Sequence, residues 1–272
     1  MSQAGFFRDK VVVVTGSSRG IGFEIARQIL AEGGKVVLHG RSLERLQVTQ
    51  TTLGFAERTL LVAADLSQPE GAETLVDAAL SGLGRIDVLI NNAGLSMRGD
   101  FIDLRATTVR TMVDANFLSA VWTTLAALPT LRATRGRVAF VSSMAALRGF
   151  PGVSLYSAAK MALTALDQSL HLEEGRRGVG FTLAFLPFTQ NDPEKTVLTA
   201  EGKLVRHQRP WQLTQAKAAS GILQAVARGK RRKSFTVNGR ILEVAQAIFP
   251  GVVEAILAAR KTKVHDIRRS SS

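Results

Sequence analysis

The sequence predicts an α/β fold: one doubly wound parallel sheet of about seven strands, with helices on both faces. Three observations carry this prediction. Short runs of β-branched and other apolar residues alternate with longer stretches at helical spacing, and short turns join them. The first run, KVVVVT at residues 10–15, is a continuous apolar strand of the kind buried on both faces of a parallel sheet. A length of 272 residues and a hydrophobic fraction of 46% suit one large core.

The expected elements alternate along the chain. Strands are predicted at residues 10–15, 35–40, 59–64, 86–91, 137–142, 179–186 and 234–238. Helices are predicted at 21–31, after Arg41, at about 70–82, at about 106–127, and through Tyr156 and Lys160 to about 174. The first strand, KVVVVT, leads directly into a glycine-rich turn and then a helix, which is the beginning of a β-α-β unit.

Two regions fall outside this alternation and set the expected domain organisation. Residues 188–210 are polar, contain NDPEK and follow the sixth strand, where a helix should begin. A long irregular loop at the carboxyl edge of such a sheet is typical of a functional lid, so we expect a substrate lid here. The catalytic domain is expected to span 1–240, and an amphipathic extension is expected over 241–272.

Composition excludes several classes of protein. The chain has no cysteine, which excludes a disulfide framework and thiol catalysis and fits a reducing compartment. The N-terminus has no secretory signal pattern, and no apolar run approaches the ~20 residues of a membrane span. We therefore expect a soluble, cytoplasmic protein. Its four histidines are scattered without metal-ligand spacing, so no metal site is expected.

The net charge of +13 is concentrated at the end of the chain. From Gly229 onward there are ten Lys and Arg residues against three acidic ones. A solvated surface, an anionic partner such as a lipid surface, or attraction of a phosphorylated cofactor each account for this excess. No nucleic-acid partner is expected, because no basic groove with interleaved aromatic residues accompanies the charge.

The turn TGSSRGIG, residues 15–22, predicts a dinucleotide site. Gly16, Gly20 and Gly22 allow a tight turn and bring the N–H groups of the following helix close to a diphosphate. A tight turn without a ligand is the alternative for a lone glycine cluster. Its place between the first strand and the first helix favours cofactor binding in a Rossmann-type sheet.

Two arginines indicate which dinucleotide is bound. The second strand ends VVLHGRS, with Arg41 rather than the carboxylate that binds the ribose of NAD, and Arg19 lies inside the glycine turn. Guanidinium groups pair well with a 2′-phosphate, so NADP(H) is favoured. The alternative is that either arginine points to solvent.

The ordered motifs resemble those of the short-chain dehydrogenase/reductase family over about residues 10–190. They are TGSSRGIG (15–22), ADL (64–66), NNAG (91–94), Asn116, VSS (141–143) and YSAAK (156–160). The resemblance implies that Asn116, Ser143, Tyr156 and Lys160 form a catalytic tetrad. It also implies a cofactor site that contains Gly16, Ser18, Arg19, Gly20, Ile21, Gly22, Arg41, Asp65, Leu66, Asn92, Ala93, Gly94, Tyr156, Lys160, Pro187 and Thr189.

The chemistry of the only tyrosine agrees with this resemblance. A free phenol has a pKa of ~10, and Lys160, one helical turn after Tyr156, would stabilise the phenolate and lower that pKa. Tyr156 would then serve as the acid and base for an alkoxide. The resemblance further implies that Ser143 stabilises charge on the substrate oxygen and that Asn116 holds a water that resupplies protons. Taken singly, Ser143 could be a strand-end cap, Asn116 a buried amide, and Tyr156 and Lys160 a surface pair.

The residues expected near the substrate are largely apolar. They are Leu95, Met97, Met144, Phe150 and Phe188, with Val153 and Trp211 nearby. Apolar linings receive apolar ligands, so we expect a hydrophobic ketone or its secondary alcohol, such as a 3-keto lipid or a ring ketone. The alternative is that several of these residues belong to the core. Many family members have Pro-Gly after the sixth strand, whereas this chain has Pro187 and Phe188, with Thr189 early.

The C-terminal extension has apolar residues at helical spacing, with a break at Pro250. They are Ile241, Val244, Ala245, Ile248, Phe249, Val252, Val253, Ile256 and Leu257. The parent domain, a sister subunit or a lipid surface would cover them. Such tails are similar to those of lipid-acting reductases, which leaves a 3-ketoacyl or 3-ketosphinganine-like reductase at a membrane, and a non-catalytic NADP-binding sensor, as alternative functions. The family resemblance implies a homodimer or homotetramer.

Overall fold

The predicted apolar runs form a parallel sheet in the computed structural model, which describes residues 5–190, 192, 194–207 and 210–259. Seven parallel strands lie in the order β10-β7-β6-β4-β1-β2-β3. Their bounds are β1 (Val11–Val14), β2 (Lys35–Gly40), β3 (Thr59–Ala63), β4 (Val88–Asn91), β6 (Arg137–Ser143), β7 (Gly180–Leu186) and β10 (Arg232–Ser234). The predicted doubly wound α/β fold is confirmed.

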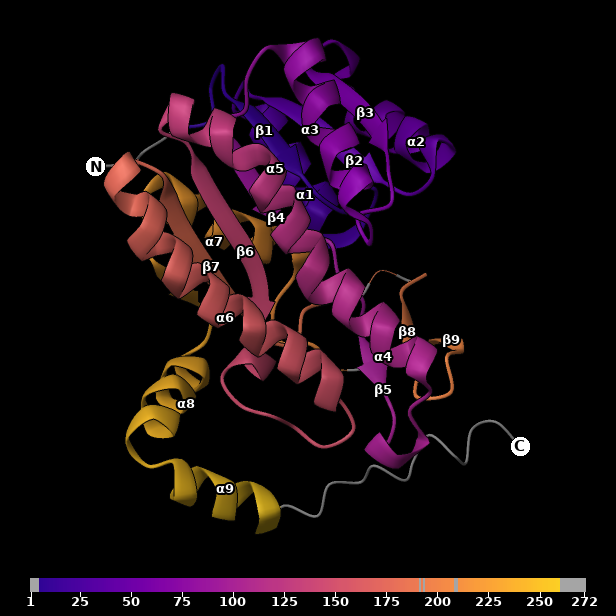
Figure 1. Cartoon of the computed structure of the whole chain (residues 1–272), viewed down its shortest axis with the longest axis vertical. Helices are drawn as coiled ribbons and strands as arrows, with labels where there is room; N and C mark the ends of the chain where they lie inside the picture. Colours follow the sequence, from indigo (N-terminus) through magenta and orange to yellow (C-terminus); the bar gives the residue numbers. More distant parts are fainter. Residues whose placement is uncertain (1–4, 191, 193, 208–209, 260–272) are drawn as a thin grey trace.

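Helices cover both faces of this sheet. On one face lie α1 (Gly20–Ala31), α2 (Leu43–Leu53) and α7 (Gln215–Ala227); on the other lie α3 (Pro69–Leu83), α5 (Ser119–Thr134) and α6 (Ser154–Glu174). Figure 1 shows α5 and α6 on the near side, with α7 behind the strands. Because alternate residues of a strand point to opposite faces, Val12 joins one core and Val13 the other.

The order of the strands places the functional edge of the sheet. The chain runs outward from β1 to β2 and β3, then returns to β4 on the other side of β1. At such a switch point the chain leaves β1 and β4 toward helices on opposite faces of the sheet, and ligands bind at the carboxyl ends of these strands. The glycine turn follows β1 and the NNAG segment follows β4, so both predicted cofactor motifs meet here.

The helix predicted at 106–127 continues further than expected. It is made of α4 (Ala106–Val113), a π-helical turn (Asp114–Leu118) and α5, which ends where Arg135 adopts φ 48°. Short 3₁₀ turns occur at Ala56–Arg58, Phe101–Asp103, Met144–Ala146 and Gly175–Arg177. π-Helical turns inside α-helices are frequent at functional sites, and this one contains Asn116.

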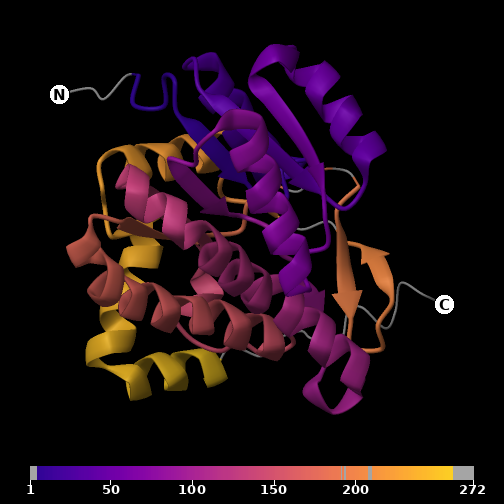
Figure 2. The ribbon, with the colours of Figure 1, turned by 45° about the horizontal axis from the view of Figure 1, so that its top comes forward.

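The expectation of an irregular loop over 188–210 is wrong in part. This segment contains β8 (Thr196–Thr199) and β9 (Leu204–Arg206), and β8 pairs in parallel with β5 (Met97–Arg98). Figure 2 shows β8 and β9 together at the side of the molecule. The strands form because the segment after β4 offers them a partner, and such a distant partner leaves no local period in the sequence.

The seventh strand was predicted too late in the chain. Residues 234–238 are not a strand: β10 ends at Ser234, and Thr236 caps α8 (Val237–Ile248) by accepting the Gly239 N–H at 3.0 Å. The predicted break before Pro250 is confirmed, because α9 (Pro250–Ala259) begins there. The expected domain boundary at residue 240 falls inside α8. Figure 1 shows α8 and α9 projecting below α6.

No helix within the described ranges is both long enough and apolar enough to cross a bilayer.

Candidate active site

The NNAG segment fixes the backbone of the glycine turn. Thr15 Oγ1 accepts the N–H groups of Asn92 and Ala93, each at 2.9 Å. The Asn92 side-chain amide donates to Thr15 O at 2.9 Å and to Gly16 O at 3.0 Å. Four hydrogen bonds therefore join the loops after β1 and β4, on the two sides of the switch point.

Gly22 is required by close packing beneath this turn. A Cβ at Gly22 would stand 2.3 Å from Gly16 O and 2.6 Å from Asn92 Nδ2. Only glycine fits, and the turn therefore packs directly on the first residues of α1. The N-terminus of a helix held in this way is a ready-made site for the diphosphate of a dinucleotide, so the residues fit the cofactor that the fold implies.

His39 is a positioning residue of the turn that the sequence interpretation missed. Gly16 N donates to His39 Nδ1 at 3.1 Å, so Nε2 carries the proton and donates to Ala64 O at 3.1 Å. Burial lowers the pKa of His39 to about 4, which keeps the ring neutral at physiological pH. The only sign of this role in the sequence is a histidine inside the otherwise apolar run of residues 36–39. Across the described residues, no three His, Cys, Asp or Glu side chains gather as a metal-ligand set.

The two arginines expected at the 2′-phosphate differ in their surroundings. Arg41 is exposed and pairs with no carboxylate of the described chain. Arg19 lies 3.9 Å from Asp192 and donates to Glu194 O at 3.3 Å, so it contacts the predicted lid. A contact of either arginine with a 2′-phosphate stays a prediction.

The remaining predicted cofactor residues line the same edge of the sheet. Asp65 follows β3, is exposed and accepts the Ser67 N–H at 3.0 Å, whereas Leu66 is buried in the core. Thr189 is buried and donates to Pro187 O at 3.1 Å. In the glycine turn, Ser18 O accepts from Thr49, and Ile21 packs against the core. Their contacts with a cofactor also stay predictions.

Lys160 is a buried cation at the carboxyl edge of the sheet. Its buried Nζ donates to Val141 O near the end of β6 at 3.1 Å and lies 5.9 Å from the centre of the Tyr156 ring. Burial, followed by the charge of Lys195 in the predicted lid, lowers the pKa of Lys160 to about 8. The ammonium form therefore predominates at neutral pH, and a buried positive charge lies beside the only tyrosine.

Asn116 and Lys160 both lie beside the Cα of Gly94. A Cβ at Gly94 would lie 2.8 Å from Asn116 Oδ1 and 3.4 Å from Lys160 Nζ. Asn116 Oδ1 accepts the Leu95 N–H at 3.1 Å, and its amide donates to Leu95 O at 2.9 Å and to Met112 O at 3.1 Å. Asn116 therefore fixes the chain directly after NNAG; its role in holding a water stays a prediction.

Ser143 ends β6 and caps the following 3₁₀ turn. Its Oγ accepts the Ala145 N–H at 3.2 Å, which is the capping interaction that sequence analysis left open. The hydroxyl proton can still be donated, because the cap uses Oγ only as an acceptor. The cap fixes Oγ at the carboxyl end of the strand whose Val141 carbonyl binds Lys160.

The apolar residues expected near the substrate divide into two groups. Leu95, Met97 and Tyr156 belong to one apolar cluster with Leu155 and Leu198, so two of the predicted residues share a cluster with the tyrosine. Met144 instead faces the start of α8: a Cβ at Gly239 would lie 2.9 Å from its sulfur. Phe150 is half-buried, Phe188 is 50% exposed and Trp211 is 51% exposed. Contacts of these aromatic residues with a substrate stay predictions.

A Rossmann-type sheet with a dinucleotide turn at its switch point, and a lysine–tyrosine pair beside it, defines a nicotinamide-dependent oxidoreductase. The family model described as short chain dehydrogenase matches residues 10–201. The chain belongs to the short-chain dehydrogenase/reductase family, whose members act on CH–OH and C=O groups with NAD(P)(H).

Individual relatives cover much of the chain. The 11-beta-hydroxysteroid dehydrogenase 1A of Arabidopsis thaliana is 32% identical over 238 residues, 84% of this chain and 68% of the relative. The 3-ketodihydrosphingosine reductase of Bos taurus is 34% identical over 185 residues, 65% of this chain and 56% of the relative. A solved short-chain dehydrogenase from Streptomyces avermitilis is similar with a TM-score of 0.77 and 26% identity, over 92% of this chain and 96% of that one.

Proposed function

We propose that this protein is an NADP(H)-dependent oxidoreductase that interconverts a hydrophobic ketone and its secondary alcohol, with Tyr156 as acid and base. The observation that carries the proposal is the buried Lys160 ammonium, 5.9 Å from the centre of the ring of the only tyrosine in the chain. A positive charge at this position favours the phenolate and brings proton transfer into the working range of pH.

The glycine turn would hold the diphosphate of the cofactor, and Arg41 its 2′-phosphate. Arg41 supports NADP(H) because it is exposed and has no carboxylate partner in the described chain, which leaves its guanidinium available to a phosphate. When bound, the cofactor supplies or accepts the hydride.

The side chains of the protein handle the proton and the developing charge. In reduction, the Tyr156 hydroxyl donates its proton to the carbonyl oxygen, and in oxidation the phenolate takes a proton from the alcohol. Lys160 stabilises the phenolate by its charge. The Ser143 hydroxyl donates a hydrogen bond to the same oxygen and stabilises negative charge there. Asn116 keeps the Leu95 backbone in place beside this centre.

The apolar surroundings of Tyr156 support a hydrophobic substrate. Leu95, Met97 and Leu155 pack in one cluster with its ring. The names of two relatives specify a hydroxysteroid and 3-ketodihydrosphingosine, so a ring ketone and a 3-keto lipid are the two substrate classes to test first. The exposed apolar face of α8 and α9 favours the lipid class as a second candidate.

Turnover of a ketone panel with NADPH tests the proposal. Ring ketones and 3-keto lipids would be offered with NADPH or NADH, and loss of reduced nicotinamide absorbance would be followed. Tyr156→Phe is expected to lower kcat by about 10²–10⁴-fold, with NADPH affinity within a few-fold of the parent. Unchanged turnover in Tyr156→Phe would refute the acid–base role. NADPH binding without turnover of any panel member or its alcohol would favour the non-catalytic sensor.

A further inference from the structure

Basic residues gather around β10, from the end of α7 to the first turn of α8, and only some of them pair with a carboxylate of the described residues. Arg231 is neutralised by Asp167 at 2.6 Å, and Arg232 by Glu243 at 2.9 Å. Four further cations in the same stretch pair with no carboxylate of the described chain: Arg228, Lys230, Lys233 and Arg240. An excess of positive charge therefore remains at one place on the surface after every local pair has formed.

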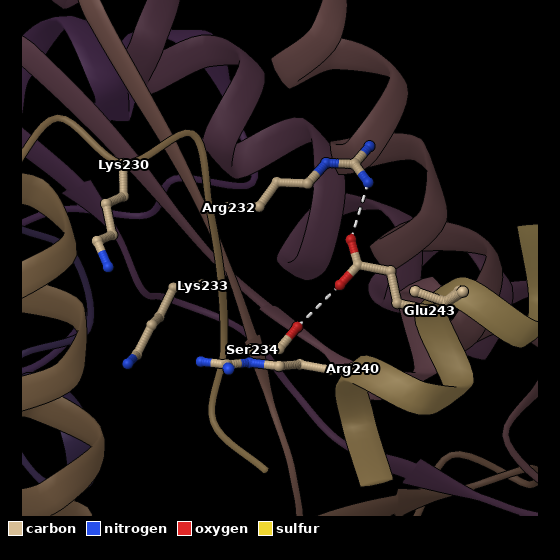
Figure 3. Close-up of a pocket in the computed structure, with 7 residues that line it drawn as sticks. Lys230, Arg232, Lys233, Ser234, Arg240 and Glu243 are labelled. Atoms are coloured by element: carbon tan, nitrogen blue, oxygen red, sulfur yellow. Dashed lines mark hydrogen bonds and ion pairs between the residues drawn. The ribbon is translucent and has the colours of Figure 1, made fainter. Parts of the chain in front are cut away.

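Three of these cations line one pocket. Lys230, Lys233 and Arg240 surround a volume of about 370 Å³, together with the Arg232–Glu243 pair, Ser234 and Val244; we call this the basic pocket. Glu243 is occupied, because its two oxygens bind Arg232 and Ser234. Figure 3 shows the nitrogen ends of Lys230, Lys233 and Arg240 gathered away from that carboxylate.

The cations of the basic pocket repel one another in the absence of an anion. Burial lowers the pKa of Lys233, and the charges of Lys230, Arg240 and Arg228 lower it further, in that order. A bound anion would relieve this repulsion and accept charge-assisted hydrogen bonds from several donors at once. The geometry and the charges together suit a phosphate group.

An exposed apolar face begins at the same pocket. Seven large apolar side chains on α8, on α9 and at the junction between them are between 52% and 72% exposed: Val237, Ile241, Val244, Ile248, Phe249, Val252 and Ile256. We call them the apolar stripe. Its α8 members follow one another at intervals of three or four residues, so they share one side of the helix. Val244 belongs to both the stripe and the basic pocket, and the two surfaces are continuous. Val253 is buried, and the side chain of Leu257 lies outside the described residues.

Charge distinguishes between two ways of covering the apolar stripe. A second copy of the chain, docked stripe to stripe, would bring the same unpaired cations of both copies into one contact. An anionic lipid surface instead offers acyl chains to the stripe and phosphate groups to the cations beside it. The charges therefore favour the lipid surface.

We propose that the apolar stripe lies on an anionic lipid surface and that the basic pocket binds a phosphate headgroup of that surface. One consequence rests on the proposed function: an apolar substrate would have a short path from the lipid surface to the active site. Met144, the residue after Ser143, faces the beginning of α8 at Gly239, so the lipid surface would meet the protein close to the end of β6.

Vesicle co-sedimentation of the full chain tests the proposal without reference to activity. The parent should bind vesicles of phosphatidylcholine with phosphatidylserine and bind pure phosphatidylcholine vesicles far more weakly. The triple variant Lys230→Gln, Lys233→Gln, Arg240→Gln should bind the anionic vesicles roughly 100-fold more weakly. The matched control Arg8→Gln, Lys35→Gln, Arg176→Gln removes the same charge from exposed positions elsewhere and should stay within about 2-fold of the parent.

A second variant tests the apolar stripe. Ile241→Ser with Ile248→Ser should reduce binding to anionic vesicles by at least about 10-fold while the melting temperature stays near that of the parent, because both side chains are exposed. Equal binding of the triple variant and its control would overturn the phosphate site. Dissociation of an oligomer by the serine pair, measured by ultracentrifugation, with unchanged vesicle binding would show instead that the stripe is a subunit contact. Binding of inorganic phosphate without vesicle binding would also contradict the proposal.

Discussion

The glycine turn and the C-terminal helices differ in how many of their polar, charged and apolar groups find partners within the described chain. At the turn, Thr15, His39 and Asn92 bind neighbouring backbone groups at 2.9–3.1 Å, and Gly22 leaves no room for a methyl group. At α8 and α9, seven large apolar side chains are more than half exposed, and neighbouring cations pair with no carboxylate among the residues that the structure describes. The glycine turn is held by contacts within the fold, whereas the C-terminal helices leave apolar and charged side chains exposed to an external partner.

The difference shows where each region obtains its stability. The turn is held by contacts inside the fold, so it can be preorganised for a ligand and keep its shape without one. The C-terminal helices are stabilised within the chain by a buried contact of Val253 and by the Glu243 pairs, and the rest of their surface suits an external partner. Substitutions should therefore act on folding in the first region and on association in the second.

The same substitution in the two regions should give the largest contrast. Ile25 is fully buried between α1 and the sheet, whereas Ile248 is 60% exposed. Ile25→Ala should lower the free energy of unfolding by about 2–5 kcal/mol, and Ile248→Ala should change it by less than about 0.5 kcal/mol. Urea unfolding in the absence of lipid measures both. Similar losses of unfolding free energy in the two variants would mean that the apolar stripe is packed within the protein, which would contradict its role as a surface for an external partner.

A methyl group added to the glycine turn should have the next largest effect. Gly22→Ala forces the turn away from Asn92 and Gly16, and should cost about 1–3 kcal/mol of unfolding free energy as well as NADPH affinity. Gly149→Ala is the matched control, because a Cβ at Gly149 has no atom within 4 Å. Unfolding curves and NADPH titrations of both variants measure the difference. A Gly22→Ala variant as stable as Gly149→Ala would show that the backbone of the turn can shift to accommodate a methyl group without loss of stability.

Two exposed arginines, Arg41 after β2 next to the glycine turn and Arg240 in α8, should respond to different ligands. Arg41→Ala should weaken NADPH binding by about 10–100-fold and leave NADH binding nearly unchanged, because only NADPH carries the 2′-phosphate. Arg240→Ala, in the basic pocket, should leave both affinities unchanged. Fluorescence titration with each dinucleotide measures these values. Equal losses for NADPH and NADH in Arg41→Ala would remove the argument for NADP(H).

The sheet and its cofactor motifs could be predicted because their signals are local. Strands buried on both faces are continuous apolar runs, as in the VVVV of β1. The glycine spacing of residues 15–22 and the Tyr156–Lys160 spacing each lie within one element. The structure places Lys160 beside Tyr156 and Asn116 beside Gly94, as expected if the motifs that contain them lie at the same edge of one sheet.

The missed features depend on contacts between distant segments. β8 forms because β5 pairs with it, and both are too short for a detectable period. β10 was placed late because Arg232 and Lys233 do not resemble an apolar strand, whereas the following SFTV does. His39 had no motif at all, since its role arises only where Gly16 and Ala64 meet it.

The proposed chemistry requires that the Lys160 ammonium makes the Tyr156 phenol acidic, and the chain permits a direct test. Because Tyr156 is the only tyrosine, the ultraviolet absorbance of phenolate during a pH titration reports on this side chain alone. We expect phenolate to appear at lower pH in the parent than in Lys160→Met, because the variant lacks the neighbouring positive charge. Superimposable titrations of the two proteins would contradict it.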